Sequence, residues 1–237
     1  MTYANHTRSL GLLLGLVAAT AARGASLQAS PVMLELTPSA ASGVINLENT
    51  GDRPINAQVR VFRWRLVDGE EQLEPTESVV ASPPTAELVS KQNYAVRVLR
   101  TDDAPVTEPE YYRVIVDELP GPQDQRPNAV TMAMRYSIPD FVEPPGGASP
   151  KLSWGWRKEG GNVVVTLRND GDRRVRISAL TLKGKGSVSF GAGLVGYALA
   201  HSEAKWSRPA KGFQGGAVKV TAQSDVGPID AEAVEQR

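Results

Sequence analysis

Short runs in which apolar and polar residues alternate recur along the whole chain, and turn residues separate them. Such alternation is typical of β-strands, and almost no segment repeats apolar residues at helical spacing over ten residues. The clearest predicted strands cover residues 32–36, 43–47, 55–66, 93–99, 111–119, 129–138, 162–167, 175–182 and 216–221. Nine or more strands without helices predict an all-β protein built of immunoglobulin-like β-sandwiches.

The first 25 residues have the features of a secretory signal peptide. A short polar start ends at Arg8, residues 10–22 are almost wholly apolar, and Ala22 and Gly24 are small residues at cleavage spacing. The alternative is a membrane anchor, but a helix that spans a bilayer needs roughly 20 apolar residues. The sequence therefore predicts an exported protein.

The clearest boundary in the remaining chain is the Pro- and Gly-rich segment 144–150. Proline and glycine interrupt strand pairing, and domain boundaries often fall in such segments. We predict an N-terminal immunoglobulin-like domain at 26–144 and a C-terminal immunoglobulin-like domain at 145–237.

An internal echo supports two related domains, because the pattern Asn-x-Gly-Asp-Arg lies between predicted strands at both 49–53 and 169–173. Gly51 and Gly171 are expected to adopt positive φ angles in tight hairpins. The Asn and Asp side chains of the pattern are expected to cap the turn backbone.

Composition and charge exclude several functions. The 26 Lys and Arg balance the 26 Asp and Glu, which argues against a nucleic-acid partner, and the absence of cysteine excludes disulfides and thiolate metal sites. After removal of the signal peptide the only histidine is His201, which we interpret as a solvated loop residue. The acid pairs Glu70/Glu71 and Asp102/Asp103 are interpreted as exposed turn residues. We predict no enzymatic activity, no metal and no cofactor.

The segment 129–138 is the most informative about function. It places Val130, Met132, Met134, Tyr136 and Ile138 on one face, with small or polar residues on the other. The apolar face could pack in a core. Alternatively, because methionine is common where one surface accepts several partners, an edge strand here could complete the sheet of another protein. The pattern leaves both interpretations open.

Several motifs resemble one family. They are Ser82-Pro83-Pro84 before a strand that ends at 96–98, Tyr111-Tyr112-Arg113 leading to Asp117-Glu118-Leu119-Pro120, Arg135-Tyr136-Ser137-Ile138-Pro139, and Phe141-Val142-Glu143-Pro144. Together with the signal peptide they resemble the periplasmic pilus (fimbrial) assembly chaperones of the chaperone/usher pathway. The Arg-Tyr-Ser-Ile-Pro motif is more similar to the branch that serves spore-coat-like and related pili.

This resemblance implies two domains in a boomerang arrangement and a function in donor-strand complementation. The chaperone would lend a strand at about 129–136 to a pilin or coat protein subunit, with Val130, Met132, Met134 and Tyr136 facing the subunit. The N-terminal strand at about 32–36 would line the opposite rim. An outer-membrane usher would receive the subunit, with no nucleotide, metal, nucleic acid or membrane insertion required. Self-association through the edge strand stays open.

One feature departs from the family pattern. Members hold the subunit's C-terminal carboxylate with an Arg on the first strand and a Lys at the end of the lending strand, but here those positions fall near Met33 and Pro139, neither of which is cationic. The candidates for a replacement anchor are Arg135, Arg97 and Arg113. The alternative function is an exported immunoglobulin-like structural or adhesive protein without chaperone activity.

Overall fold

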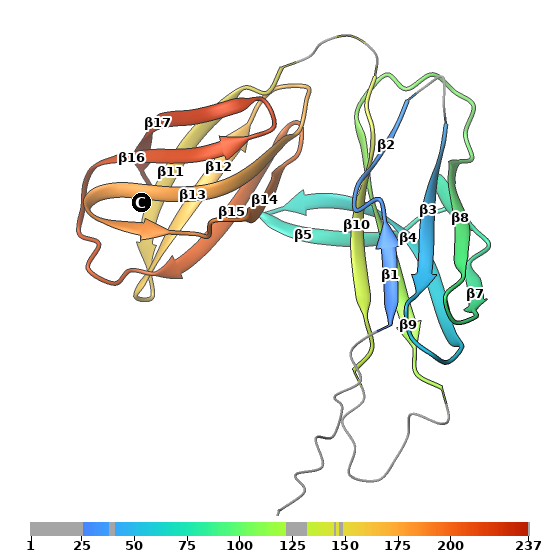
Figure 1. Cartoon of the computed structure of the whole chain (residues 1–237). Coiled ribbons are helices and arrows are strands. Elements are labelled where there is room, and N and C mark those ends of the chain that lie inside the picture. Colours follow the sequence, from blue (N-terminus) through green and yellow to red (C-terminus); the bar gives the residue numbers. More distant parts are fainter. Residues whose placement is uncertain (1–25, 38–40, 122–131, 145, 147–148, 237) are drawn as a thin grey trace, which may run out of the picture.

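The computed structural model describes residues 26–37, 41–121, 132–144, 146 and 149–236. The predicted signal peptide lies outside the described residues. Figure 1 shows two lobes set at an angle, with β1–β10 in one and β11–β17 in the other, which confirms the all-β boomerang. The described part contains strands and no helix, so it offers no helical segment able to cross a membrane.

The N-terminal lobe is a sandwich of two sheets. One has the order β1-β3-β8-β6, and the other has the order β2-β10-β9-β4-β5, with β7 also paired to β4. The strands are β1 (Leu27–Ser30), β2 (Leu34–Leu36), β3 (Ser42–Asn49), β4 (Ile55–Val67), β5 (Glu70–Pro75), β6 (Val79–Ser82), β7 (Thr85–Leu88), β8 (Asn93–Arg100), β9 (Glu110–Leu119) and β10 (Arg135–Val142). We call them the β8 sheet and the β9 sheet.

The C-terminal lobe is one sheet of order β14-β13-β16-β17-β11-β12-β15. The strands are β11 (Leu152–Glu159), β12 (Asn162–Asn169), β13 (Val175–Ser189), β14 (Leu194–Ala198), β15 (Ser202–Pro209), β16 (Gly215–Ser224) and β17 (Gly227–Glu235). The two end strands, β14 and β15, lie close together: a Cβ added at Gly196 of β14 would lie 2.8 Å from Nε1 of Trp206 on β15. The sheet thus curls around its own core.

All nine predicted segments contain strand residues, but eight strands were not predicted, namely β1, β5, β6, β7, β11, β14, β15 and β17. Strand β5 is exposed throughout, so its sequence lacks apolar alternation. The interpretation of Glu70 and Glu71 as turn acids is therefore wrong, whereas Asp102 and Asp103 do lie exposed outside strands. The domain limits at 144/145 stay a prediction, since the structure places Val142 at the end of β10 and Leu152 at the start of β11.

The two Asn-x-Gly-Asp-Arg corners have the same hydrogen bonds. Buried Asn49 donates to Arg53 O at 2.7 Å and accepts from Gly51 N at 2.9 Å, and Asn169 repeats both bonds with Arg173 and Gly171. The predicted Asn caps are therefore confirmed.

The predicted positive φ angles at Gly51 and Gly171 are wrong, because neither glycine has one. Each corner joins strands that do not pair, so it is not a hairpin. Glycine is needed for space instead: a Cβ at Gly171 would lie 2.3 Å from Ser149 O, and one at Gly51 would lie 2.8 Å from Ser26 Cβ.

A third apolar cluster joins the two lobes, and we call it the junction cluster. Trp64, Tyr111 and Phe141 come from the N-terminal lobe, and Tyr197 and Leu199 come from the C-terminal lobe. The ring of Tyr197 lies 5.5 Å from those of both Trp64 and Phe141. Aromatic packing of this kind holds the lobes in a defined relative position.

Candidate functional site

Strand β10 has an edge without a neighbouring strand along part of its length. It pairs with β9 from Arg135 to Val142, but β2 pairs with its other side only from Asp140 to Val142. The ladder with β9 extends beyond the strand, because Glu118 N donates to Met134 O at 2.8 Å. From Met134 to Pro139, β10 therefore has one strand neighbour among the described residues.

Strand geometry shows which backbone groups this edge presents. Opposed residues in an antiparallel pair alternate between exchanging hydrogen bonds and not doing so. Met134 bonds to β9, so Arg135 and Ser137 direct their N–H and C=O groups away from it. The backbone of Pro139 also faces away from β9, so the absence of an N–H group at this residue does not remove a hydrogen bond from the ladder with β9. The edge thus offers donors and acceptors that an added strand could pair with.

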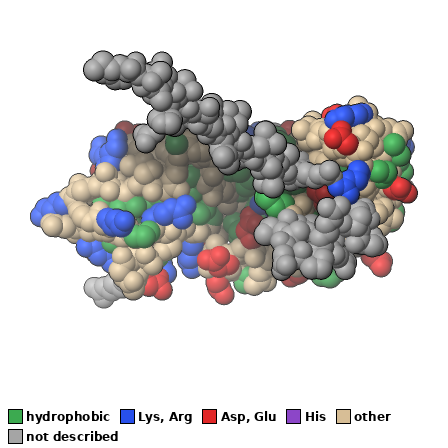
Figure 2. All heavy atoms as spheres, turned by 60° about the horizontal axis from the view of Figure 1, so that its bottom comes forward, with side chains coloured by type: hydrophobic (Ala, Val, Ile, Leu, Met, Phe, Trp, Pro, Cys, Tyr) green, Lys and Arg blue, Asp and Glu red, His purple; other side chains and the backbone are tan. Residues whose placement is uncertain are grey.

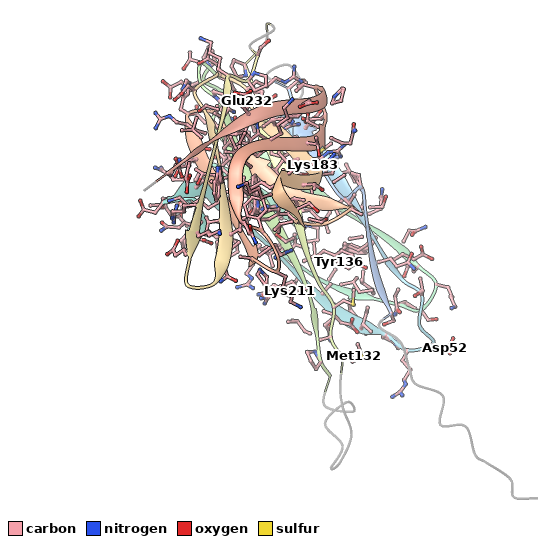
Figure 3. The ribbon with its side chains drawn as sticks, turned by 90° about the vertical axis from the view of Figure 1, so that its left-hand side faces the viewer. Asp52, Met132, Tyr136, Lys183, Lys211 and Glu232 are labelled. Carbon is pink, nitrogen blue, oxygen red and sulfur yellow. The ribbon has the colours of Figure 1, made fainter. Side chains whose placement is uncertain are left out.

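The apolar face of this segment becomes progressively less buried toward its N-terminal end. Ile138 is 1% exposed, Met134 and Tyr136 are partly buried against the N-terminal core, and Met132 is 67% exposed. Figure 3 shows Met132 near the far end of the lobe and Tyr136 nearer its middle. Val130 lies outside the described residues. Four side chains were predicted to face the subunit. Among those that the structure describes, only Met132 is mostly exposed and so accessible to a partner.

Strand β1 of the β8 sheet lies across from the free edge of β10 in the β9 sheet. It pairs only with β3 among the described strands, so both sheets end here. The Tyr136 hydroxyl spans the gap and donates to Leu27 O of β1 at 2.8 Å. The expectation that 32–36 lines the opposite rim is wrong, because Leu34–Leu36 pairs in parallel with β10 itself. The first strand is split in two, and its second half changes sheets.

The outer face of the β9 sheet looks into the space between the lobes, where Figure 2 shows hydrophobic side chains in a hollow. Every residue from Tyr111 to Asp117 is buried, so β9 is covered on both faces. Met33 packs against the junction cluster and Pro139 is buried. Arg113 lies directly opposite Pro139 on the neighbouring strand.

Arg113 packs against two aromatic rings of the junction cluster. Its guanidinium carbon lies 3.7 Å from the centroid of the Trp64 ring and 5.8 Å from that of Tyr197 in the other lobe. Its Nη2 donates to Glu71 Oε1 at 2.5 Å. Its Nε is buried and has no hydrogen-bond partner in the described part of the chain. The buried Nε–H of Arg113 is therefore a donor without a partner among the described residues.

The other two candidate arginines lie elsewhere. Arg135 is mostly exposed and, with Arg60, binds Asp117. Burial acts to raise the pKa of Asp117, but hydrogen bonds from Arg135 and Arg60 outweigh it and lower this pKa. Arg97 is exposed on β8, between the core residues Val96 and Val98, and so points outward from the β8 sheet. The structure thus does not bring Arg97 together with Arg113 and Arg135.

Three residues of this region were not predicted as site residues, namely Leu27, Arg60 and Glu71. Arg60 could have been found, because on a predicted strand it has the same parity as Phe62 and Trp64 and so lies on the same face. No local pattern marks Leu27 or Glu71, since their partners lie more than 40 residues away. Elsewhere, His201 is exposed and contacts Asp172 Oδ1 at 2.7 Å, as expected for a loop histidine. No cluster of acids and histidines among the described residues could hold a metal ion.

Comparisons with known proteins agree with this architecture. A family model described as pili and flagellar-assembly chaperone, PapD N-terminal domain, matches residues 26–148. The uncharacterized fimbrial chaperone YhcA of Escherichia coli (strain K12) is 26% identical over 125 residues, which cover 52% of this chain and 53% of that protein. The match thus spans about half the length of this relative.

Solved structures match over most of the chain. One is the chaperone–tip adhesion subunit pre-assembly complex CsuC–CsuE from archaic chaperone-usher Csu pili of Acinetobacter baumannii, with TM-score 0.71 and 25% identity over 90% of this chain and 100% of that chain. The SafB chaperone of Salmonella enterica, solved with SafA pilin, has TM-score 0.62 and 17% identity over 90% of this chain and 98% of that chain. The family model covers more than half of the residues. The chain belongs to the family of pili and flagellar-assembly chaperones.

Proposed function

We propose that this protein is a periplasmic chaperone that binds pilus or coat subunits by donor-strand complementation and delivers them to an outer-membrane usher. The observation that carries the proposal is the unpaired edge of β10, with Met132 exposed beside it. The family membership and the predicted signal peptide support the location. Neither a cofactor nor enzymatic activity is part of the mechanism.

The physical basis is β-strand addition. A subunit strand that pairs with the edge at Arg135 and Ser137 would gain main-chain hydrogen bonds, and alternate side chains would fill its groove. Burial of a large apolar side chain contributes about 1.5–3 kcal/mol. Met132 would supply one such contribution, and Val130 is proposed to supply another. The bound subunit would leave when a better-fitting strand replaces the borrowed one.

Met134 and Tyr136 have a different part in this proposal. Both are partly buried in the chaperone's own core, and Tyr136 is bonded to β1. A side chain already packed in its own domain gains little from a partner. We therefore assign Met134 and Tyr136 to holding the strand in position and setting its distance from β1.

The carboxylate anchor is assigned to Arg113. It lies opposite Pro139, where the family pattern has a lysine, and it has a free Nε–H. A guanidinium can bind a carboxylate through two parallel hydrogen bonds. Arg135 is the second candidate, but its side chain is 67% exposed, whereas that of Arg113 is 10% exposed.

Met132→Asp is the test of strand lending. The variant should fold normally, because Met132 contacts solvent, yet it would place a carboxylate in an apolar groove. We expect recovery of a co-expressed pilin or coat subunit from a neighbouring gene to fall by at least about tenfold, since 1.4 kcal/mol corresponds to that factor. The measurement is quantitative co-purification with the tagged chaperone.

Val226→Asp is the matched control, because Val226 is an exposed apolar residue of the other lobe. It should leave subunit recovery unchanged. Thermal unfolding of both variants should match that of the unaltered protein. Full subunit recovery with folded Met132→Asp would overturn the strand-lending proposal.

A further inference from the structure

We propose that Glu71 is an internal competitor that occupies Arg113 in the free protein and must be displaced before a carboxylate ligand can bind there. This inference rests on the proposed function, in which Arg113 anchors the subunit's terminal carboxylate. It adds a residue that regulates the anchor and lies on a different strand from it.

The contact between Glu71 and Arg113 is incomplete. The Nε–H and Nη2 groups lie along the same edge of a guanidinium, and a carboxylate that binds side-on uses both. Glu71 uses Nη2 and leaves the buried Nε without a partner in the described structure. A free carboxylate can approach without a tether and use both donors. Arg113 can therefore offer a carboxylate ligand one more hydrogen bond than it makes with Glu71.

The two side chains differ in exposure, and this favours exchange. The side chain of Arg113 is 10% exposed, whereas that of Glu71 is 50% exposed. Trp64 holds the guanidinium plane from one side, so the arginine is fixed. Glu71 extends from β5, in which every residue is exposed. Movement of Glu71 into solvent would therefore uncover Arg113 without disturbing a core.

The β4–β5 hairpin keeps Glu71 close to Arg113. Its tip contacts the C-terminal lobe, where Lys205 N donates to Gly69 O at 3.2 Å and Lys205 Nζ donates to Asp68 O at 3.0 Å. Gly69 has φ +84°, and a Cβ there would lie 2.4 Å from Lys205 Cγ, so glycine permits this approach. Figure 1 shows the hairpin reaching from the N-terminal lobe to the other lobe. Glu71 thus lies two residues from Gly69, where the hairpin tip is held by its hydrogen bonds to Lys205 of the C-terminal lobe.

A tethered competitor has a measurable effect on selectivity. Effective concentrations of groups joined by short linkers are in the millimolar range or above. Glu71 would therefore exclude small carboxylates at lower concentrations from Arg113. A subunit that also pairs with β10 brings its own tethered carboxylate and can compete. The device would restrict the anchor to ligands that engage the strand edge.

The experiment uses acetate as the smallest carboxylate probe and follows the ¹⁵N signal of Arg113 Nε–H by NMR in the full protein. We expect Glu71→Gln and Glu71→Ala to respond to acetate at concentrations at least about tenfold lower than the unaltered protein, because the competitor is gone. Acetamide should cause no shift. Glu74→Gln is the matched control, since Glu74 lies on the same strand but contacts Arg65 at 3.5 Å.

The outcomes separate this inference from the proposed function. Equal acetate responses in all four proteins would overturn the role of Glu71. Subunit binding by the unaltered protein, and its loss in Met132→Asp, would still support strand lending in that case. Conversely, if folded Met132→Asp retained the subunit while Glu71→Gln exposed Arg113 to acetate, the competitor would stand and strand lending would fall.

Discussion

Replacement of Arg174 by methionine is expected to lower the free energy of unfolding by about 3 kcal/mol, the lower end of the range for breaking a buried ion pair. The side chain of Arg174 is 3% exposed and connects the lobes. It contacts Glu35 of β2, donates to Asp225 Oδ2 at 3.1 Å, and lies 3.8 Å over the Phe141 ring. Removal would leave these acids without their cation, although the exposure of Glu35 moderates the cost.

Urea unfolding, monitored by tryptophan fluorescence, measures this change. Arg173→Met is the matched control, because Arg173 is the neighbouring residue but is 48% exposed and lies 3.7 Å from Glu143. An exposed pair contributes at most about 1 kcal/mol. Small-angle scattering should also show a broader range of lobe orientations for Arg174→Met. Equal losses of stability in the two variants would contradict the structural role of Arg174.

The long strands could be predicted from the sequence because their burial differs between the two faces. Strand β4 carries Ala57 and Val59 on its core side, and this alternation is visible in the chain. Strand β5 has no buried residue, so hydrophobicity carries no signal for it. The pairing of β5 with β4 places Glu71 beside Arg113, and this pairing depends on the assembled sheet rather than on a local sequence pattern.

The candidate site could be predicted only in part for a related reason. The alternation at 129–138 identifies the apolar face of the lending strand, but it does not distinguish exposed Met132 from partly buried Met134. Met134 packs against the N-terminal core just before β10, whereas Met132 lies two residues farther out and is exposed. The position of Arg113 beside Pro139 depends on a register between residues 26 positions apart. Local patterns do not specify such registers.

Asp140→Val is expected to stabilise the protein by about 4 kcal/mol at pH 8. Asp140 lies on β10 at 0% exposure, and neither carboxylate oxygen has a hydrogen-bond partner within the described structure. Burial raises the pKa of Asp140 from 3.8 to about 7. Each unit of difference between the folded and unfolded pKa corresponds to about 1.4 kcal/mol, and the penalty is fully present above the folded value.

Because the pKa of Asp140 is higher in the folded protein than in the unfolded chain, the effect of Asp140→Val depends on pH in a distinctive way. Between about pH 4 and pH 7 the unfolded chain loses this proton while the folded protein keeps it, so this residue makes stability fall as the pH rises. The difference in unfolding free energy between Asp140→Val and the unaltered protein should therefore increase across this range and level off above it. Asp230→Val, a change at an exposed acid on β17, is the surface control for the replacement itself. A flat difference for Asp140→Val would mean that Asp140 is ionised or paired in the folded protein.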